Sequence, residues 1–144
     1  MSRDTSTGQV LEAMVLPALR RGGYICREQV RIGERPNGRA HNVDVIAEKD
    51  NQKFLVSLKW QQTSGTAEQK VPYEVICLIK SVRESNGEYS RAYIVLGGPG
   101  WTLRDYYTSG DLSEYLRYEE YVSIITLEDF IAMATEGTYE SQAV

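Results

Sequence analysis

The chain has 144 residues, of which 42% are hydrophobic and 25% are charged. This composition excludes a disordered chain, and the length suits one packed domain over residues 1–144. No apolar run approaches the roughly 20 residues that a membrane-spanning helix needs, and the first residues lack the apolar segment of a signal peptide. We therefore expect a cytoplasmic domain that has no membrane partner.

The net charge of −4 is distributed unevenly along the chain. Residues 1–40 hold seven arginines against four acidic residues, whereas residues 105–144 hold nine acidic residues and one arginine, Arg117. A basic half and an acidic half suit a protein with one face for a polyanion such as nucleic acid. Ordinary surface charge explains the same pattern equally well, so charge alone leaves both interpretations open.

The first part of the chain predicts a helix followed by three strands. Apolar residues recur at helical spacing from Thr5 or Ser6 to about Arg21. Period-two patterns bounded by turn residues predict three strands, at 24–32, 40–48 and 53–61. The last two strands are joined by a turn at Asp50-Asn51.

The remainder of the chain alternates helices and strands. Thr66 and Gln69 predict a capping box for a helix that runs to about Arg83. A strand at 92–96, a partly helical segment at 101–118 and a strand at 121–125 follow, and Thr126 with Asp129 predicts the cap of a last helix. The order α-β-β-β-α-β-α-β-α predicts an α/β fold with one mixed sheet flanked by helices.

Strand alternation gathers polar side chains on one face of the predicted sheet. Ser57, Lys59 and Gln61 share a face of their strand. If the hairpin is centred between Asp50 and Asn51, Asp44 pairs with Ser57, and Asn42 pairs with Lys59. A carboxylate, a hydroxyl, an ammonium and two amides then converge on one patch.

This group of side chains suits metal-assisted hydrolysis of phosphodiesters. A carboxylate such as that of Asp44 binds Mg²⁺ through oxygen, and the metal lowers the pKa of a bound water. A lysine such as Lys59 can orient that water or stabilise developing negative charge. A surface hairpin with mixed polar residues is the alternative interpretation.

Three short motifs and their order resemble the PD-(D/E)xK nuclease superfamily, to which most type II restriction endonucleases belong. Asn42-Val43-Asp44 is similar to the first motif without its proline, and Ser57-Leu58-Lys59 to the second. Gln61 is similar to the glutamine that often follows that lysine. The helix that contains Glu12 resembles the first helix of many members, where a glutamate can reach the metal. The order of elements over residues 6–97 is that of the family core, so the resemblance implies a restriction-endonuclease-like fold.

Ser57 departs from the family motif, which has an acidic residue at this position. Some restriction enzymes of the superfamily also have serine there and supply the acid from the next helix. Glu74, fifteen residues after Lys59, is close to the spacing in those enzymes. On a helical wheel Glu68 lies well within the apolar face and Glu74 at its edge. Both stay candidates, and spacing favours Glu74.

The resemblance implies a DNA endonuclease of restriction or DNA-processing type that depends on Mg²⁺ or Mn²⁺. It implies Asp44, Glu74 and Leu58 as metal-binding residues, Lys59 as acting on the water or on the transition-state charge, and Gln61 as orienting substrate or water. Glu12, Ser57 and Glu68 are further candidates for the site. The predicted DNA contacts are Arg39, His41, Ser64 and Lys70.

The small size leaves little room for a separate recognition domain. We therefore expect a homodimer or a second subunit in addition to DNA. The missing acid at Ser57 favours an alternative, a catalytically inactive nuclease fold that binds DNA or a partner protein.

Overall fold

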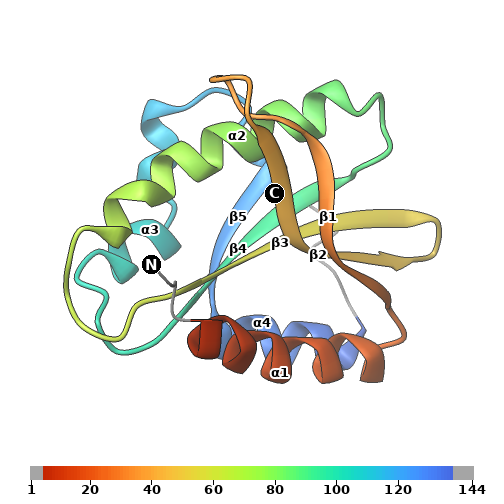
Figure 1. The fold of residues 1–144 in the computed structure, drawn as a ribbon, viewed down its shortest axis with the longest axis horizontal. Helices are drawn as coiled ribbons and strands as arrows, with labels where there is room; N and C mark the ends of the chain where they lie inside the picture. Colours follow the sequence, from red (N-terminus) through yellow and green to blue (C-terminus); the bar gives the residue numbers. More distant parts are fainter. Residues whose placement is uncertain (1–4, 138–144) are drawn as a thin grey trace.

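The computed structural model describes residues 5–137, which form a five-stranded sheet with helices on both faces (Figure 1). The elements follow the predicted order. They are α1 (Thr5–Arg21), β1 (Ile25–Glu34), β2 (Ala40–Lys49), β3 (Gln52–Trp60), η1 (Ala67–Lys70), α2 (Val71–Glu84), β4 (Arg91–Gly97), α3 (Arg104–Thr108), η2 (Asp111–Tyr115), η3 (Glu119–Tyr121), β5 (Val122–Thr126) and α4 (Leu127–Glu136). None of these helices is both long and apolar enough to cross a membrane.

The sheet is mixed, as predicted, with the strands in the order β1-β2-β3-β4-β5. The first three strands are antiparallel, and β4 and β5 each run parallel to the strand before them. Every residue of β4 from Ala92 to Gly97 is buried, because helices cover both faces of the sheet at this strand. This explains the unbroken apolar run that marks β4 in the sequence.

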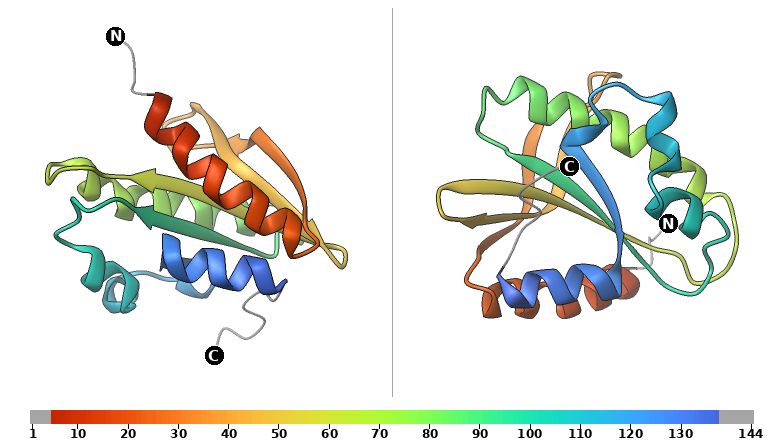
Figure 2. Two further views of the ribbon diagram at one scale, coloured as in Figure 1. Left: turned by 90° about the horizontal axis from the view of Figure 1, so that it is seen from below. Right: turned by 180° about the vertical axis from the view of Figure 1, so that it is seen from behind.

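Two hydrophobic cores lie on opposite faces of the sheet. Helices α1 and α4 lie side by side on one face (Figure 2), where Val15 and Phe130 pack with Val56 of β3. Helix α2 covers the other face, where Leu78 packs with Leu55 of β3. Neighbouring residues of β3 thus enter different cores, as the predicted alternation requires.

Two local predictions are confirmed at turn and cap residues. Asp50 and Asn51 both have left-handed backbones, with φ of 55° and 65°, as a two-residue hairpin turn requires. Lys49 consequently pairs with Gln52. At the start of α4, the side chain of Thr126 accepts a hydrogen bond from the Asp129 N–H, as expected of an N-cap.

The predicted capping box at the start of the second long helix is wrong. Thr66 has a helical backbone and makes no side-chain cap, and a 3₁₀ turn, η1, precedes α2. Pro72 has no N–H to donate to the carbonyl of Glu68, so an α-helix continuing through this point would lack that bond. The Glu68 carbonyl instead accepts from the Val71 N–H of the 3₁₀ turn and from the Tyr107 hydroxyl, the latter at 2.7 Å.

Candidate active site

Four of the predicted site residues lie at the point where β2 and β3 separate, which we call the fork: Asp44, Ser57, Lys59 and Glu74. The two strands pair from Lys49 with Gln52 to Val45 with Val56, in the predicted register. Beyond these pairs β2 remains bound to β1 and passes toward α2, while β3 remains bound to β4 (Figure 1). The predicted pairing of Asp44 with Ser57, and of Asn42 with Lys59, is therefore wrong, because the strands have already diverged.

Asp44 lies at this fork and joins the two strands through its side chain. Its Oδ2 accepts a 2.7 Å hydrogen bond from the Leu58 N–H of β3. The regular alternation of β2 is interrupted here, since Val43 packs in the α2 core and Val45 in the core of α1 and α4. Alternation along the sequence therefore could not give the direction of the Asp44 side chain.

A second contact connects Asp44 to helix α1. The Gln29 amide nitrogen donates to Asp44 Oδ1 at 3.3 Å and to Glu12 Oε2 at 3.2 Å. Two carboxylates from different elements thus share one donor at the surface of the fork. Glu12 was predicted as an outer member of the site, and this contact brings it to the same amide as Asp44.

Glu74 of α2 reaches the fork from the other face of the sheet. Its Oε2 accepts a 3.1 Å hydrogen bond from the Ser57 hydroxyl and lies 3.3 Å from His41 Nε2. Its Oε1 accepts a 3.0 Å hydrogen bond from Arg35 Nη1. Glu74 is only 5% exposed. A carboxylate from α2 therefore contacts the side chain at the position where the family motif has an acid.

Glu74 is held in its ionised form. Burial is the largest single influence and raises the pKa of Glu74. The hydrogen bond from His41, the charge of Lys59 and the hydrogen bond from Arg35 together outweigh burial and lower this pKa to about 2. Lys59 is half-buried and lies one residue beyond Leu58 on the same strand. Glu74, Asp44 and Lys59 thus gather around three consecutive residues of β3.

Glu68, the alternative source of the acid, does not contact β3. Its carboxylate accepts hydrogen bonds from the Thr102 N–H, the Thr102 hydroxyl and the Leu103 N–H. The Thr102 hydroxyl is the largest influence on Glu68 and lowers its pKa. The wheel position was misleading because Glu68 belongs to the 3₁₀ turn, which has about 3.0 residues per turn instead of 3.6.

Gln61 and His41 are also used differently from the prediction. The Gln61 amide is buried, and its nitrogen donates to the Gly100 carbonyl at 2.8 Å, so this end of the side chain fixes the loop after β4. A Cβ at Gly98 would collide with the Gln61 carbonyl oxygen, which shows how closely this loop packs. His41 is fully buried against Glu74, so it cannot contact a DNA backbone as predicted.

The other predicted DNA contacts lie on exposed surface. Arg39 belongs to the loop before β2, Ser64 to the loop after β3 and Lys70 to the end of η1.

Sequence reasoning missed the partners of the carboxylates, Arg35 and Gln29. Arg35 lies in the turn before β2, where its N–H donates to the Arg39 carbonyl at 2.8 Å. The fold of the turn brings its guanidinium to a helix 39 residues later in the chain. No local pattern in the sequence marks either contact.

The donor set at the fork fits a hard divalent cation. Asp44 and Glu12 offer carboxylate oxygens on either side of one amide nitrogen, and Mg²⁺ commonly binds one or two carboxylates and completes its shell with water or phosphate. Within residues 5–137, no three His, Cys, Asp or Glu side chains come close enough to form a metal site made of protein alone. An ion held at the fork would therefore need further ligands from water or from a substrate.

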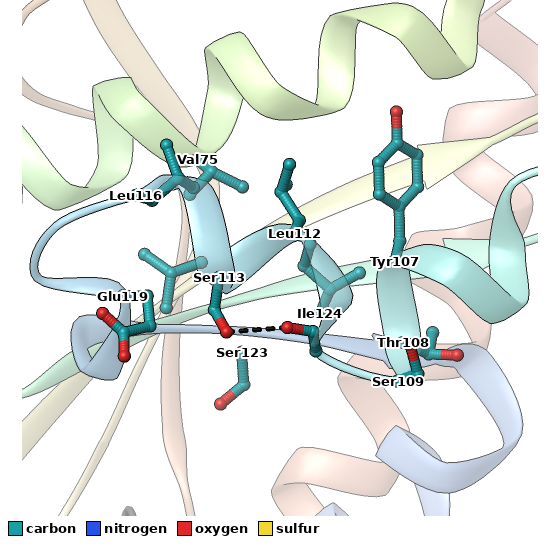
Figure 3. Close-up of a pocket in the computed structure, with 12 residues that line it drawn as sticks. Val75, Tyr107, Thr108, Ser109, Leu112, Ser113, Leu116, Glu119, Ser123 and Ile124 are labelled. Atoms are coloured by element: carbon teal, nitrogen blue, oxygen red, sulfur yellow. Dashed lines mark hydrogen bonds between the residues drawn. The ribbon is translucent and has the colours of Figure 1, made fainter.

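A pocket of about 230 Å³ lies elsewhere, between α2, the α3–η2 segment and β5 (Figure 3). None of the predicted site residues lines it. Its hydroxyl groups on Thr108, Ser109 and Ser113 donate to main-chain carbonyls of their own turns. Among the residues that line this pocket only Glu119 carries a charge, so the pocket lacks the cluster of charged groups found at the fork.

The fold and the fork define a nuclease-like α/β domain. The sequence matches the family model of the PD-(D/E)XK nuclease superfamily domain over residues 3–138, and the chain belongs to this superfamily. A search of curated proteins finds no match.

Two solved structures are similar to the chain. One is a protein of unknown function, AF1548, with 14% sequence identity and a TM-score of 0.51 over 78% of this chain and 54% of that protein. The chain thus spans about half the length of AF1548. The other is the small subunit of the heterodimeric restriction endonuclease R.BspD6I, with 15% identity and a TM-score of 0.44 over 90% of this chain and 73% of that subunit. At these identities the similarity concerns the fold alone.

Proposed function

We propose that the protein is an endonuclease that hydrolyses phosphodiester bonds in DNA and depends on Mg²⁺ or Mn²⁺. Membership of the superfamily supports nuclease chemistry. The observation that carries the proposal for this chain is the 3.1 Å hydrogen bond between Ser57 and Glu74. It supports the view that Glu74 supplies the carboxylate that the motif lacks at position 57.

Each residue at the fork has a role in this proposal. Asp44, whose carboxylate is fixed by the Leu58 N–H, is the principal metal ligand, with Glu12 and Glu74 as further acids. Leu58 is proposed to bind the metal through its main chain, because its apolar side chain offers no ligand. The bound cation supplies a polarised phosphate and a water of lowered pKa. Lys59 places a positive charge beside the carboxylates, where it can stabilise the negative charge that develops on phosphate.

The test is cleavage of plasmid and phage DNA in the presence of Mg²⁺ or Mn²⁺. Wild type is compared with Asp44→Asn, Lys59→Met and Glu74→Gln, each checked for folding by circular dichroism. Lys53→Met is the matched control for Lys59→Met, because Lys53 is a half-buried lysine at the other end of β3, where it pairs with Glu88. We expect metal-dependent cutting that falls at least about 100-fold in the three site variants and persists in Lys53→Met.

Two results would contradict parts of this proposal. Cutting that survives in Glu74→Gln but is lost in Asp44→Asn and Lys59→Met would remove Glu74 from the chemistry and leave Glu12 as the second acid. Absence of metal-dependent cutting by wild type, on DNA from many sources, would contradict the nuclease assignment of the isolated chain.

The structure also favours a second candidate, an inactive nuclease fold that binds DNA. Glu74 already contacts three partners, Arg35, His41 and Ser57. A buried carboxylate whose hydrogen bonds are all made within the protein is typical of an ion pair that only stabilises the fold. This candidate predicts DNA binding whose affinity falls linearly with the logarithm of salt concentration. It also predicts that Asp44→Asn alters stability without altering that binding.

DNA contacts and assembly complete the proposal. Arg39, Ser64 and Lys70 are exposed and are proposed to bind the phosphate backbone. A homodimer or a complex with a second subunit is proposed as the working form, because cutting both strands of a duplex requires two sites.

A further inference from the structure

Gln29 of β1 lies between two carboxylates that come from different elements of the fold. Its amide nitrogen is 3.2 Å from Glu12 Oε2 of α1 and 3.3 Å from Asp44 Oδ1 of β2. The distance between the two carboxylate oxygens therefore cannot exceed the sum of these two hydrogen-bond lengths. Gln29 is exposed, so water and dissolved ions reach this group.

The backbone at Gln29 interrupts the regular pattern of its strand. Its φ is 53°, in the left-handed region that residues with a Cβ rarely adopt. Before it, Cys26 packs against the core of α1 and α4, and after it, Val30 packs against the core of α2. The strand thus changes face at Gln29, directly beside the point where β2 changes face at Asp44. The glutamine amide reaches both carboxylates from this position.

The chemistry of the amide group suits a site that exists with and without a cation. Two neighbouring carboxylates repel each other, and a shared N–H donor reduces that repulsion. A divalent cation would do so far more strongly, but the N–H groups would then point at a positive charge. The other end of the amide is a carbonyl oxygen, a hard ligand of the kind that Mg²⁺ and Mn²⁺ prefer. Rotation by about 180° about the Cγ–Cδ bond exchanges the two ends.

We propose that Gln29 positions Glu12 and Asp44 in the metal-free protein and becomes a metal ligand when the cation binds. Its Nε2 bridges the two carboxylates while the site is free. When Mg²⁺ or Mn²⁺ enters, the amide turns and its Oε1 joins Glu12 and Asp44 as a third oxygen ligand. The inference rests on the proposed function, from which it takes the cation, and it assigns part of the site to α1 and β1.

The test measures metal binding in the full-length chain without DNA. Affinity for Mn²⁺ is determined by calorimetry for wild type, Gln29→Met, Gln29→Glu and Asp44→Asn. Gln52→Met is the control, because Gln52 is an exposed glutamine at the start of β3. We expect Gln29→Met to weaken Mn²⁺ binding about 10-fold and Gln29→Glu to strengthen it. Without metal, Gln29→Glu is expected to melt at a lower temperature than Gln29→Met, because it places three carboxylates together.

A second readout follows the amide directly. The side-chain amide signal of Gln29, identified in a ¹⁵N spectrum by its loss in Gln29→Met, is followed during a titration with Mg²⁺. We expect it to shift and to saturate with the Kd that calorimetry with Mg²⁺ gives. Calorimetry and the spectrum together report on the ligand without any cleavage assay.

The outcomes separate this inference from the proposed function. Mn²⁺ binding that Asp44→Asn removes, but that both Gln29 variants leave at the wild-type affinity, would overturn the role of Gln29 alone. A Gln29 amide signal that does not move as Mg²⁺ saturates the site would do the same. Wild-type Mn²⁺ binding that is absent, or that Asp44→Asn does not reduce, would overturn the proposed function together with the inference.

Discussion

The hydroxyl of Ser57 donates a hydrogen bond to Glu74 Oε2 across 3.1 Å, between two residues 17 positions apart in the chain. A carboxylate on α2 thereby reaches the strand position that carries an acid in the family motif. A carboxylate at the fork can therefore come either from a side chain at position 57 or from one at position 74.

Exchange of the two positions tests this equivalence. Glu74→Gln is expected to lose metal-dependent cleavage, and the double variant Ser57→Asp with Glu74→Gln is expected to recover at least about 10-fold of the loss, because the acid returns to the fork. Ser57→Asp alone places two carboxylates in contact and should lower the free energy of unfolding by about 1–3 kcal/mol. Cleavage rates and urea unfolding are measured on all three variants. A folded double variant as inactive as Glu74→Gln would show that the two positions are not equivalent.

The low pKa of Glu74 predicts how stability depends on pH. The carboxyl has a pKa of about 2 in the folded protein and about 4.3 in an unfolded chain. Because the folded pKa is the lower one, the stabilisation is complete above about pH 5 and is lost as the pH falls toward 2. It amounts to about 3 kcal/mol, since one pKa unit corresponds to about 1.4 kcal/mol.

Urea unfolding of wild type and Glu74→Gln between pH 3 and pH 7 measures the contribution of ionised Glu74 to the free energy of unfolding. The wild-type free energy of unfolding should fall more steeply below pH 5 than that of Glu74→Gln, which cannot release a proton at this position. Arg35, His41 and Lys59 surround position 74 in both proteins, so the difference between the two curves reports on the carboxylate of Glu74. Parallel curves across this range would show that Glu74 is not specially stabilised in its ionised form.

The fold was predictable from sequence because its signals are local. The turn at Asp50-Asn51 set the register of β2 against β3, and the alternation of Phe54, Leu55 and Val56 assigned their faces. These features depend on backbone geometry over a few residues, and a period of two is enough to reveal them.

The details of the site were not predictable because they depend on departures from regular geometry. The change of face of β2 at Asp44 breaks the alternation, and the divergence of β2 from β3 breaks the pairing, on which the predicted patch relied. The left-handed backbone at Gln29, which brings its amide to Asp44, has no sequence signal either. The 3₁₀ turn before α2 altered the direction of Glu68. Glu74 was found by analogy of spacing, whereas its partner Arg35 lies 39 residues away and carries no sequence signal.

Glu68 offers a test of which glutamate serves the site. Its carboxylate receives three hydrogen bonds from Thr102 and Leu103. Glu68→Gln turns an amide donor toward these donors and should lower the free energy of unfolding by about 1–3 kcal/mol. Mn²⁺ affinity, measured by calorimetry, should remain that of wild type. If Glu68→Gln keeps its stability and loses metal binding, Glu68 and not Glu74 is the relocated acid.

Lys49 is expected to contribute strongly to stability although it lies far from the site. Its ammonium donates to the Gly22 carbonyl just after α1 and to the Gly137 carbonyl just after α4, at 2.7 Å each. A cation at the C-terminal ends of two helices also interacts favourably with both helix dipoles. Lys49→Met should therefore lower the free energy of unfolding by about 1–3 kcal/mol.

Lys53→Met is the matched control for Lys49→Met, because Lys53 is also a lysine of this hairpin. Its partner Glu88 is half exposed, with a side-chain exposure of 51%, so the pair is screened by water and salt and should contribute less than about 1 kcal/mol. Urea unfolding at low and high salt measures both variants. The Lys49 effect should persist at high salt, since its partners are partly buried carbonyls. Equal losses in the two variants would mean that the ammonium of Lys49 does not join the ends of α1 and α4.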